Sequence, residues 1–290
     1  MNDDVKPFVG REALSAGLVT VHELRSKHQW LFPDIYLSGH DAPTLWQRTF
    51  AAWLYSHREG VVAGQAAAAL HGAKWVDEDE PIDLVWSQAR PPSGIRTSNP
   101  RLPRAEFETL DGMRVTTAAR TAFDLGRQQP RYPLTWHTLA RLDALAAATG
   151  LTKEDIEVVA QRHRGARGLR KLRQALDLID PGAQSPQETR IRILLINAGL
   201  PRTRTQIPVF DPLDGCWYFI DMGWEHGRVG VEYEGAYHQT DRGRYVRDIK
   251  KRDALTRLGW RIVWVLKEDT DWEIVQRVRR ARETARSAAI

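Results

Sequence analysis

Three acids, Asp221, Glu232 and Glu234, lie in a segment whose spacing is typical of a β-hairpin. A four-residue loop at 225–228 would set Asp221 directly opposite Glu232, on the same face of the sheet. Two carboxylates held about 5 Å apart between their β-carbons repel each other unless a cation lies between them. Glu234 projects from the same face as Glu232, because side-chain direction alternates along a strand. The segment therefore predicts a metal site with up to three carboxylates.

The composition of the 290-residue chain indicates a cytoplasmic protein. The length predicts two or three domains, each able to bury its own core. A single cysteine, Cys216, excludes an internal disulfide and indicates a reducing compartment. The first residues lack the pattern of a signal peptide, and no apolar run approaches the roughly 20 residues needed to cross a membrane. We therefore expect no membrane segment.

The formal net charge of +5 is unevenly distributed. Residues 1–125 carry 13 basic and 16 acidic side chains, residues 126–182 carry 10 and 6, and residues 183–290 carry 19 and 15. This pattern predicts that a polyanion such as DNA is bound mainly by the second half of the chain. The alternative is that the many arginines only solvate the surface.

The first 125 residues predict a module that contains a winged helix near residues 8–40. The second helix begins with a capping-box signature, but only Arg25 and Lys27 are cationic on it. A packing or oligomerisation role, for instance in a homodimer, is therefore as open as DNA reading. The expected helices and strands of this order lie at 10–16, 20–27, 30–31 and 35–37. Further elements are expected at 45–56, 63–70, 82–86, 113–116 and 117–125.

Residues 126–182 predict a helical connector, with helices across 133–179. The connector concentrates cationic side chains around a glycine-marked bend. Clustered arginines suit bidentate phosphate contact, although a solvated helix face explains the same pattern. The connector ends at the Pro and Gly residues of 180–184, which stop a helix. The candidate nucleic-acid contacts here are Arg164, Arg167, Arg170 and Lys171.

A small α/β domain is expected at 183–290. Ser185 caps a helix that runs to residue 198 and carries Glu188 on the same face as Ile191. Glu188 is thus aimed inward, unless it only closes the capping box. The hairpin follows, with Trp224 paired to Val229. A helix at 244–258, an apolar strand at 261–266 and a helix at 272–285 complete the expected order. The whole chain is thus predicted to be α/β, in the sense of an α+β multidomain protein.

The residues from 185 to 285 resemble the very-short-patch-repair-like branch of the PD-(D/E)xK nuclease superfamily. The resemblance rests on an acid in a leading helix, the string Glu232-Tyr-Glu-Gly-Ala-Tyr-His238, an Asp and an Arg on the next helix, and Gly259-Trp260 before the apolar strand. The first 125 residues are similar, more diffusely, to type IV (AbiEi-like) antitoxin modules. The resemblance implies a restriction-endonuclease-like domain at 183–290.

The resemblance implies an endodeoxyribonuclease that uses a divalent metal. Asp221 and Glu232 would bind Mg²⁺ or Mn²⁺, with a main-chain carbonyl and waters completing the shell, and Glu188 would hold one of those waters. His238 is a candidate proton carrier or phosphate contact, and Arg252 would orient an acid or bind phosphate. The expected catalytic set is Glu188, Asp221, Glu232, Glu234, His238, Asp248 and Arg252.

Glu234 departs from the superfamily pattern, which usually has lysine at this position. Either His238, Lys250 or Lys251 supplies the positive charge, or a second metal binds beside Glu234, or the site cleaves weakly. Lys250, Lys251 and Arg244 are also candidate DNA contacts. The competing hypotheses are a non-catalytic DNA-binding regulator that retains a nuclease fold, and an interaction scaffold that binds no nucleic acid.

Overall fold

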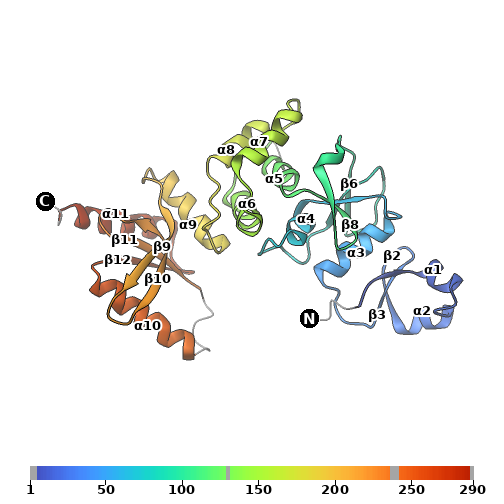
Figure 1. Ribbon diagram of the computed structural model, residues 1–290, viewed down its shortest axis with the longest axis horizontal. Helices are drawn as coiled ribbons and strands as arrows, with labels where there is room; N and C mark the ends of the chain where they lie inside the picture. Colours follow the sequence, from blue (N-terminus) through green and yellow to red (C-terminus); the bar gives the residue numbers. More distant parts are fainter. Residues whose placement is uncertain (1–4, 129–130, 236–241, 288–290) are drawn as a thin grey trace. The chain divides into compact units, whose positions relative to one another are not determined.

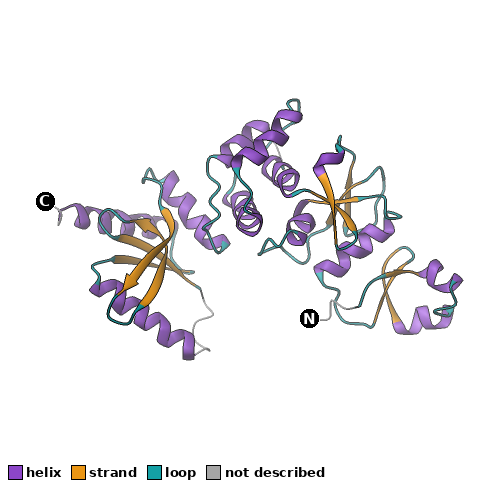
Figure 2. Ribbon diagram, in the orientation of Figure 1, coloured by secondary structure: helices purple, strands orange, loops and turns teal. Residues whose placement is uncertain are grey.

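The computed structural model describes residues 5–128, 131–235 and 242–287, with the side chains of 242–245 excepted. Helices and three mixed or antiparallel sheets confirm the predicted α+β multidomain class (Figures 1 and 2). The chain divides into two compact units, Met1–Leu134 with Leu145–Ile179, and Thr135–Ala144 with Asp180–Ile290. One boundary falls at the start of the predicted linker 180–184. The predicted three-part division, with a separate connector at 126–182, stays a prediction.

The N-terminal unit begins with the predicted order of helix, turn, helix and two strands. Thr20 starts the second helix, because its side chain accepts from the Glu23 N–H while the Glu23 carboxylate accepts from the Thr20 N–H. A two-residue strand that the sequence did not reveal pairs with the last strand, giving the sheet order β1-β3-β2. The elements are β1 (Phe8–Val9), α1 (Gly10–Ser15), α2 (Val21–Lys27), β2 (His28–Phe32) and β3 (Ile35–Ser38).

A five-stranded sheet of order β6-β5-β4-β8-β7 forms the rest of the sheet structure in this unit. Its buried strand residues, such as Val62, Leu84 and Val115, share one hydrophobic core with Ala51 of α3. Three of its strands were not predicted from sequence. The elements are α3 (Leu45–Tyr55), β4 (Val61–Ala63), α4 (Gly64–Leu70), β5 (Ile82–Val85), β6 (Ile95–Ser98), the 3₁₀ turn Arg104–Glu106, β7 (Phe107–Leu110), β8 (Met113–Thr116) and α5 (Ala118–Arg127).

The predicted helical region follows as α6 (Trp136–Thr149), α7 (Lys153–Arg162) and α8 (Leu169–Leu176). A buried ionic network joins α5 to α7 and the 3₁₀ turn. Arg120, only 1% exposed, donates to Glu106 at 2.5 Å and to Asp124 at 2.7 Å, and His163 Nε2 lies 2.8 Å from Glu106. Since buried charges are tolerated only when paired, these contacts fix the helices on the five-stranded sheet.

The C-terminal unit is built on a four-stranded sheet of order β12-β11-β10-β9. Strands β9, β10 and β11 are antiparallel, and β12 lies parallel to β11. The predicted order is confirmed, with β9 added by the structure. The elements are α9 (Pro186–Asn197), β9 (Arg204–Asp211), β10 (Cys216–Trp224), β11 (Val229–Glu234), α10 (Arg242–Arg257), β12 (Arg261–Leu266) and α11 (Asp271–Ser287).

Helices cover both faces of this sheet (Figure 1). One core contains Met222 and Val231 of the sheet together with residues of α9 and α11. The other contains Ile220 of the sheet and Leu255 of α10. Gly230 lies on the α10 side, where an added β-carbon would come within 2.6 Å of Ile262. The side chains of β11 therefore alternate between a face under α9 and α11 and a face under α10.

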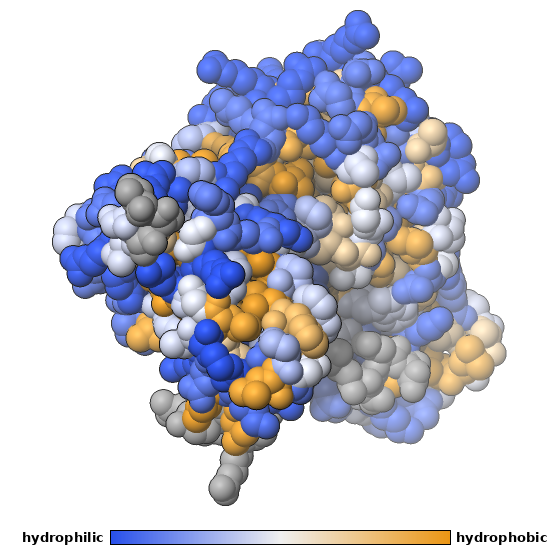
Figure 3. Space-filling view, turned by 60° about the vertical axis from the view of Figure 1, so that its left-hand side comes forward, coloured by the Kyte–Doolittle hydropathy of each residue, from blue (hydrophilic) through white to orange (hydrophobic). Residues whose placement is uncertain are grey.

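Hydrophobic residues on the face shown in Figure 3 lie in separate patches between hydrophilic ones. Exposed large side chains include Leu18 and Trp272, which are 77% and 71% exposed. Among the described residues, the helices are too short or too polar to span a membrane.

Candidate functional site

The β10–β11 hairpin has the predicted register. Trp224 pairs with Val229 and Met222 pairs with Val231, on either side of the turn at 225–228. Continuing this register brings Asp221 beside Glu232. The main chain confirms their proximity, because the Asp221 N–H donates to Glu232 Oε1 at 3.3 Å.

Both hairpin carboxylates are held by the backbone of the facing strand. The Tyr233 N–H donates to Asp221 Oδ2 at 2.9 Å, which complements the bond from the Asp221 N–H to Glu232. Glu232 is buried and Asp221 half-buried. Reciprocal bonds of this kind fix the direction of each carboxylate and leave further lone pairs on both.

Glu188 reaches the same site from the first turn of α9. Its carboxylate accepts from the Gln184 N–H at 2.9 Å and from the Ser185 hydroxyl at 2.8 Å. The Ser185 oxygen accepts in turn from the Glu188 N–H, so local bonds that start the helix also orient the acid. Glu188 is 7% exposed and lies close enough to Asp221 for electrostatic interaction. Glu188 is therefore an inward-facing acid, and it does not close the expected capping box, because its carboxylate accepts from the Gln184 N–H and not from the Ser185 N–H.

Lys251 brings a positive charge into this cluster of acids from α10. Its Nζ donates to Glu232 Oε2 at 2.7 Å, with the lysine side chain 20% exposed and that of Glu232 6% exposed. The ammonium also interacts with Asp221 and Glu188. Of the cations expected to replace the superfamily lysine, Lys251 is thus placed at the acids, whereas Lys250 is exposed. We call Glu188, Asp221, Glu232 and Lys251 the acid site.

Burial gives the three carboxylates of the acid site unusual proton affinities. Burial, with the nearby Asp221 charge as a smaller cause, raises the pKa of Glu188 to about 7 and the pKa of Glu232 to about 7. Burial also raises the pKa of Asp221. Lys251 opposes these shifts without cancelling them. Such displaced pKa values are typical of functional sites, where like charges are gathered in a cleft.

Glu234 and Arg252 form a second ion pair beside the acid site. Arg252 Nη2 donates to Glu234 Oε2 at 2.5 Å, and its guanidinium lies 4.2 Å from the centre of the Trp264 ring. Both side chains are more exposed than Glu232. Asp248 lies on the same helix, one turn before Arg252, and is half-buried. The interpretation that Arg252 orients an acid is therefore supported by its contact with Glu234.

The acid site offers hard oxygen donors, the ligands that Mg²⁺ and Mn²⁺ prefer. Within the described part of the chain, no three His, Cys, Asp or Glu side chains are already gathered as a ready metal cluster. The predicted set of Glu188, Asp221 and Glu232 is therefore not gathered as three ligands among the described residues, and Glu188 is bonded to Gln184 and Ser185. Asp221 and Glu232 are in contact within the hairpin, and Glu188 interacts with Asp221 electrostatically.

The other predicted site residues fall into three groups. His238 lies outside the described residues, and Arg244 lies on α10 with its side chain outside them. The second group belongs to the N-terminal unit and is exposed: Arg164 and Arg167 lie in the turn between α7 and α8, and Arg170 lies at the start of α8. Lys171 is the exception, as explained next.

Lys171 is not available as a phosphate contact in this structure. It is 8% exposed, and its Nζ donates to the Gln128 main-chain oxygen at 2.9 Å. Burial lowers the pKa of this lysine. The sequence placed Lys171 with the exposed arginines because charge alone does not reveal which side of a short helix faces inward.

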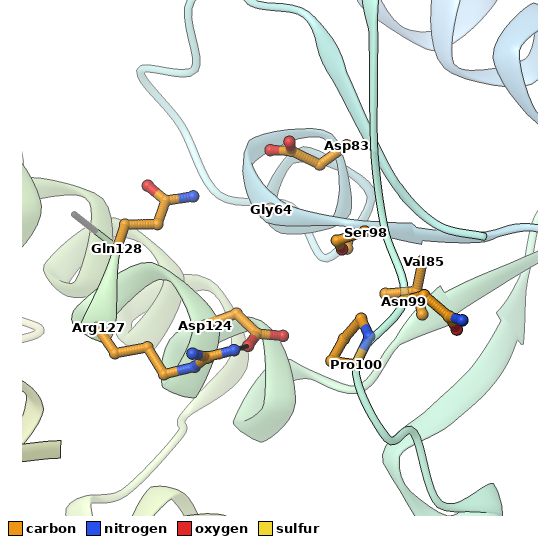
Figure 4. Close-up of a pocket in the computed structure, with 10 residues that line it drawn as sticks. Gly64, Asp83, Val85, Ser98, Asn99, Pro100, Asp124, Arg127 and Gln128 are labelled. Carbon is orange, nitrogen blue, oxygen red and sulfur yellow. Dashed lines mark hydrogen bonds and ion pairs between the residues drawn. The ribbon is translucent and has the colours of Figure 1, made fainter. Parts of the chain in front are cut away.

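A cavity of about 380 Å³ lies in the N-terminal unit, between the five-stranded sheet and α5 (Figure 4). Its charged groups are already paired: Asp83 binds Arg96 at 2.8 and 2.9 Å, and Asp124 accepts from Arg127 at 2.8 Å. This internal neutralisation makes the cavity a weaker candidate than the acid site. Its lining consists of Ala63, Gly64, Asp83, Val85, Ser98, Asn99, Pro100, Asp124, Arg127 and Gln128.

The fold and the acid site define a two-unit α+β protein with buried carboxylates and one lysine on a helix-covered sheet. Over 189 residues the chain is 30% identical to the uncharacterized protein Rv2248 of Mycobacterium tuberculosis (strain ATCC 25618 / H37Rv). It is equally similar to the uncharacterized protein MT2308 of strain CDC 1551 / Oshkosh. These matches cover 63% of this chain and 67% of each relative. The chain belongs to the same family as these two mycobacterial proteins.

Two further comparisons found nothing. No protein-family profile matches the chain. No solved structure matches it significantly.

Proposed function

We propose that the C-terminal unit is a divalent-metal-dependent endonuclease that hydrolyses phosphodiester bonds of DNA. The observation that carries the proposal is the contact between Asp221 and Glu232 in one hairpin, with Lys251 bound to Glu232 and Glu188 in electrostatic interaction with Asp221 and Lys251. Burying like charges costs free energy, and a site that does so without a structural need is a candidate for function. The resemblance to the very-short-patch-repair-like nucleases supports the same proposal.

The charge balance of the acid site favours a bound cation. With all groups ionised, the site holds three carboxylates and one ammonium; the raised pKa values of Glu188 and Glu232 reflect mainly burial and, next, the charge of Asp221. Mg²⁺ or Mn²⁺, held by Asp221 and Glu232, would relieve the excess of negative charge. When bound, such an ion supplies Lewis-acid polarisation of the scissile phosphate and an acidified water.

The residues of the chain have separate roles in this proposal. Asp221 and Glu232 hold the cation, and the facing main-chain N–H groups fix their direction. Glu188 orients the attacking water and, with its pKa of about 7, can take a proton from it near neutral pH. Lys251 supplies the positive charge that Glu234 cannot, and stabilises the developing charge on the phosphate. Arg252 forms an ion pair with Glu234, which neutralises that carboxylate beside the acid site.

The test uses supercoiled plasmid and single-stranded DNA with Mg²⁺, Mn²⁺ or chelator. We expect metal-dependent cleavage by the natural chain and a loss of at least about a hundredfold in Asp221→Asn and Glu232→Gln. Asp253→Asn is the matched control, since Asp253 is exposed on the helix that carries Lys251. Cleavage that persists in chelator, or in Asp221→Asn, would refute the proposal.

The competing function is a non-catalytic DNA-binding regulator. One observation favours it: Lys251 already neutralises Glu232 without any metal. This function predicts DNA binding that is independent of Mg²⁺ and unchanged in Asp221→Asn, with no cleavage under any condition. Binding measured by fluorescence anisotropy in chelator and in Mg²⁺ separates the two functions.

A further inference from the structure

A second pocket of the C-terminal unit, of about 280 Å³, lies between the β10–β11 turn and the end of α11. The turn lies directly against the helix, because an added β-carbon at Gly227 would be 3.5 Å from that of Ala285. The pocket is lined by His226, Gly227, Val229, Arg282, Ala285 and Arg286. All of its ionisable groups are therefore basic.

The two arginines share one face of α11 because they are four residues apart. Like charges at this spacing destabilise a helix. Burial lowers the pKa of Arg282, and the charge of Arg286 lowers it further. Among residues 5–128, 131–235 and 242–287, neither guanidinium forms an ion pair. The pocket thus holds two neighbouring positive charges that the described part of the chain leaves uncompensated.

Arg282 is held in a defined position. Its guanidinium lies 4.4 Å from the centre of the Trp224 ring, and the Trp224 indole N–H donates to the Pro201 oxygen at 3.2 Å. Stacking uses the face of a guanidinium and leaves its N–H edge free to bind an oxyanion. The negative end of the helix dipole favours cations in the last turn, but this effect is weak at an exposed position and needs no pocket.

We infer that this pocket binds a phosphate-type oxyanion through Arg282, Arg286 and His226. Paired arginines bind such anions with bidentate, charge-assisted hydrogen bonds. The anion comes either from a free phosphorylated compound or from the backbone of a nucleic acid. The pocket lies on the α11 side of the sheet with Val229, whereas Glu232 faces α10. The inference therefore does not rest on the proposed nuclease activity.

The test titrates inorganic phosphate into the full-length protein in chelator, so that metal-dependent cleavage plays no part. Isothermal titration calorimetry is followed by a repeat with Arg286→Gln, chosen because Arg286 is exposed and its replacement spares the core. We expect saturable binding that weakens at least about tenfold in Arg286→Gln. Arg280→Gln, an equal charge change at an exposed position of the same helix, should leave the affinity unchanged.

A second arm identifies the source of the anion. If the site binds a nucleic-acid backbone, a short oligonucleotide displaces phosphate. Arg286→Gln then reduces, by about one, the slope of the logarithm of the oligonucleotide binding constant against the logarithm of the salt concentration. If the site binds a free phosphorylated compound, the oligonucleotide does not compete with phosphate. The inference is overturned if phosphate does not saturate and Arg286→Gln binds oligonucleotide as Arg280→Gln does. Asp221→Asn should bind phosphate normally even if it abolishes cleavage.

Discussion

Raising the pH should destabilise the C-terminal unit, because the acid site binds protons more tightly when folded than when unfolded. The pKa of Glu188 and that of Glu232 rise from 4.5 to about 7 on folding. Between these values the unfolded chain has released the protons and the folded chain still holds them. The stabilisation is therefore complete at low pH and lost as pH rises towards 7.

The magnitude follows from about 1.4 kcal/mol per pKa unit. One independent carboxyl group would lose about 3 kcal/mol over this interval. Two independent groups would lose about 6 kcal/mol. Because Glu232 titrates together with the adjacent Asp221, the contributions do not add fully, and we expect a total of at least about 3 kcal/mol between pH 5 and pH 8. For a unit of this size the loss corresponds to a fall of about 10 °C in the melting temperature.

Differential scanning calorimetry at pH 5 and pH 8 measures this difference. Glu232→Gln should retain about half of the pH dependence, and the double variant Glu188→Gln with Glu232→Gln should retain little. Glu283→Gln, at an exposed position, is the control and should behave as the natural chain does. The readout is the change with pH, because Glu232→Gln also leaves Lys251 without its charged partner. Equal pH dependence in the natural chain and the double variant would refute the assignment of raised pKa values.

Three other substitutions test separate parts of the structure. Lys251→Met should reduce the rate of DNA cleavage by at least about a hundredfold and change the DNA affinity in chelator little. The control Lys250→Met should cleave normally. Equal cleavage by the two variants would show that Lys251 has no part in the mechanism. Arg120 is 1% exposed, and Arg120→Met would leave the carboxylates of Glu106 and Asp124 without this partner. Urea unfolding of the N-terminal unit should then show a free energy of unfolding lower by about 3–5 kcal/mol. A loss below about 1 kcal/mol would contradict the role of the network. Gly230→Ala places a methyl group 2.6 Å from Ile262, so urea unfolding of the C-terminal unit should show a loss of about 1–3 kcal/mol; an unchanged midpoint would contradict the close packing at this position.

The parts of the fold that sequence predicted well have strong local signals. Strand β12 was predicted with its observed bounds, because a strongly apolar run that starts after Arg261 lies between the glycine stop at Gly259 and polar residues. Helix α9 has its expected start, since Ser185 caps it and proline occupies its first position. The hairpin register followed from the length of the turn at 225–228.

The missed strands lack such signals. Strand β9 contains Pro208, and a proline argues against a strand in a sequence-based prediction. The proline is tolerated because β9 lies at the edge of its sheet. Strands β4, β6 and β7 have only three or four residues and owe their structure to their neighbours.

The sequence predicted the contacts of the site that lie within one hairpin, but not those between elements far apart in the chain. Asp221 and Glu232 belong to one hairpin, so spacing alone paired them. Lys251 comes from a helix with little amphipathic pattern, and sequence could not tell it from Lys250 as the residue that faces inward. The network of Arg120 with His163 was missed because its members are far apart in sequence and meet only through packing.

Protons and a divalent cation should compete for the acid site, which gives a test of metal binding that requires no catalysis. Below pH 7, Glu188 and Glu232 each retain protons that a cation must displace. At pH 6.5 we therefore expect Mg²⁺ binding to release about one proton, so that the heat measured by calorimetry depends on the ionisation enthalpy of the buffer. At pH 8.5 the protons are already gone, and the dependence should vanish. If Mg²⁺ binds at pH 6.5 without releasing protons, it binds at a place other than the acid site. The buried carboxylates of the acid site would then be stabilised only by Lys251 and the backbone N–H groups.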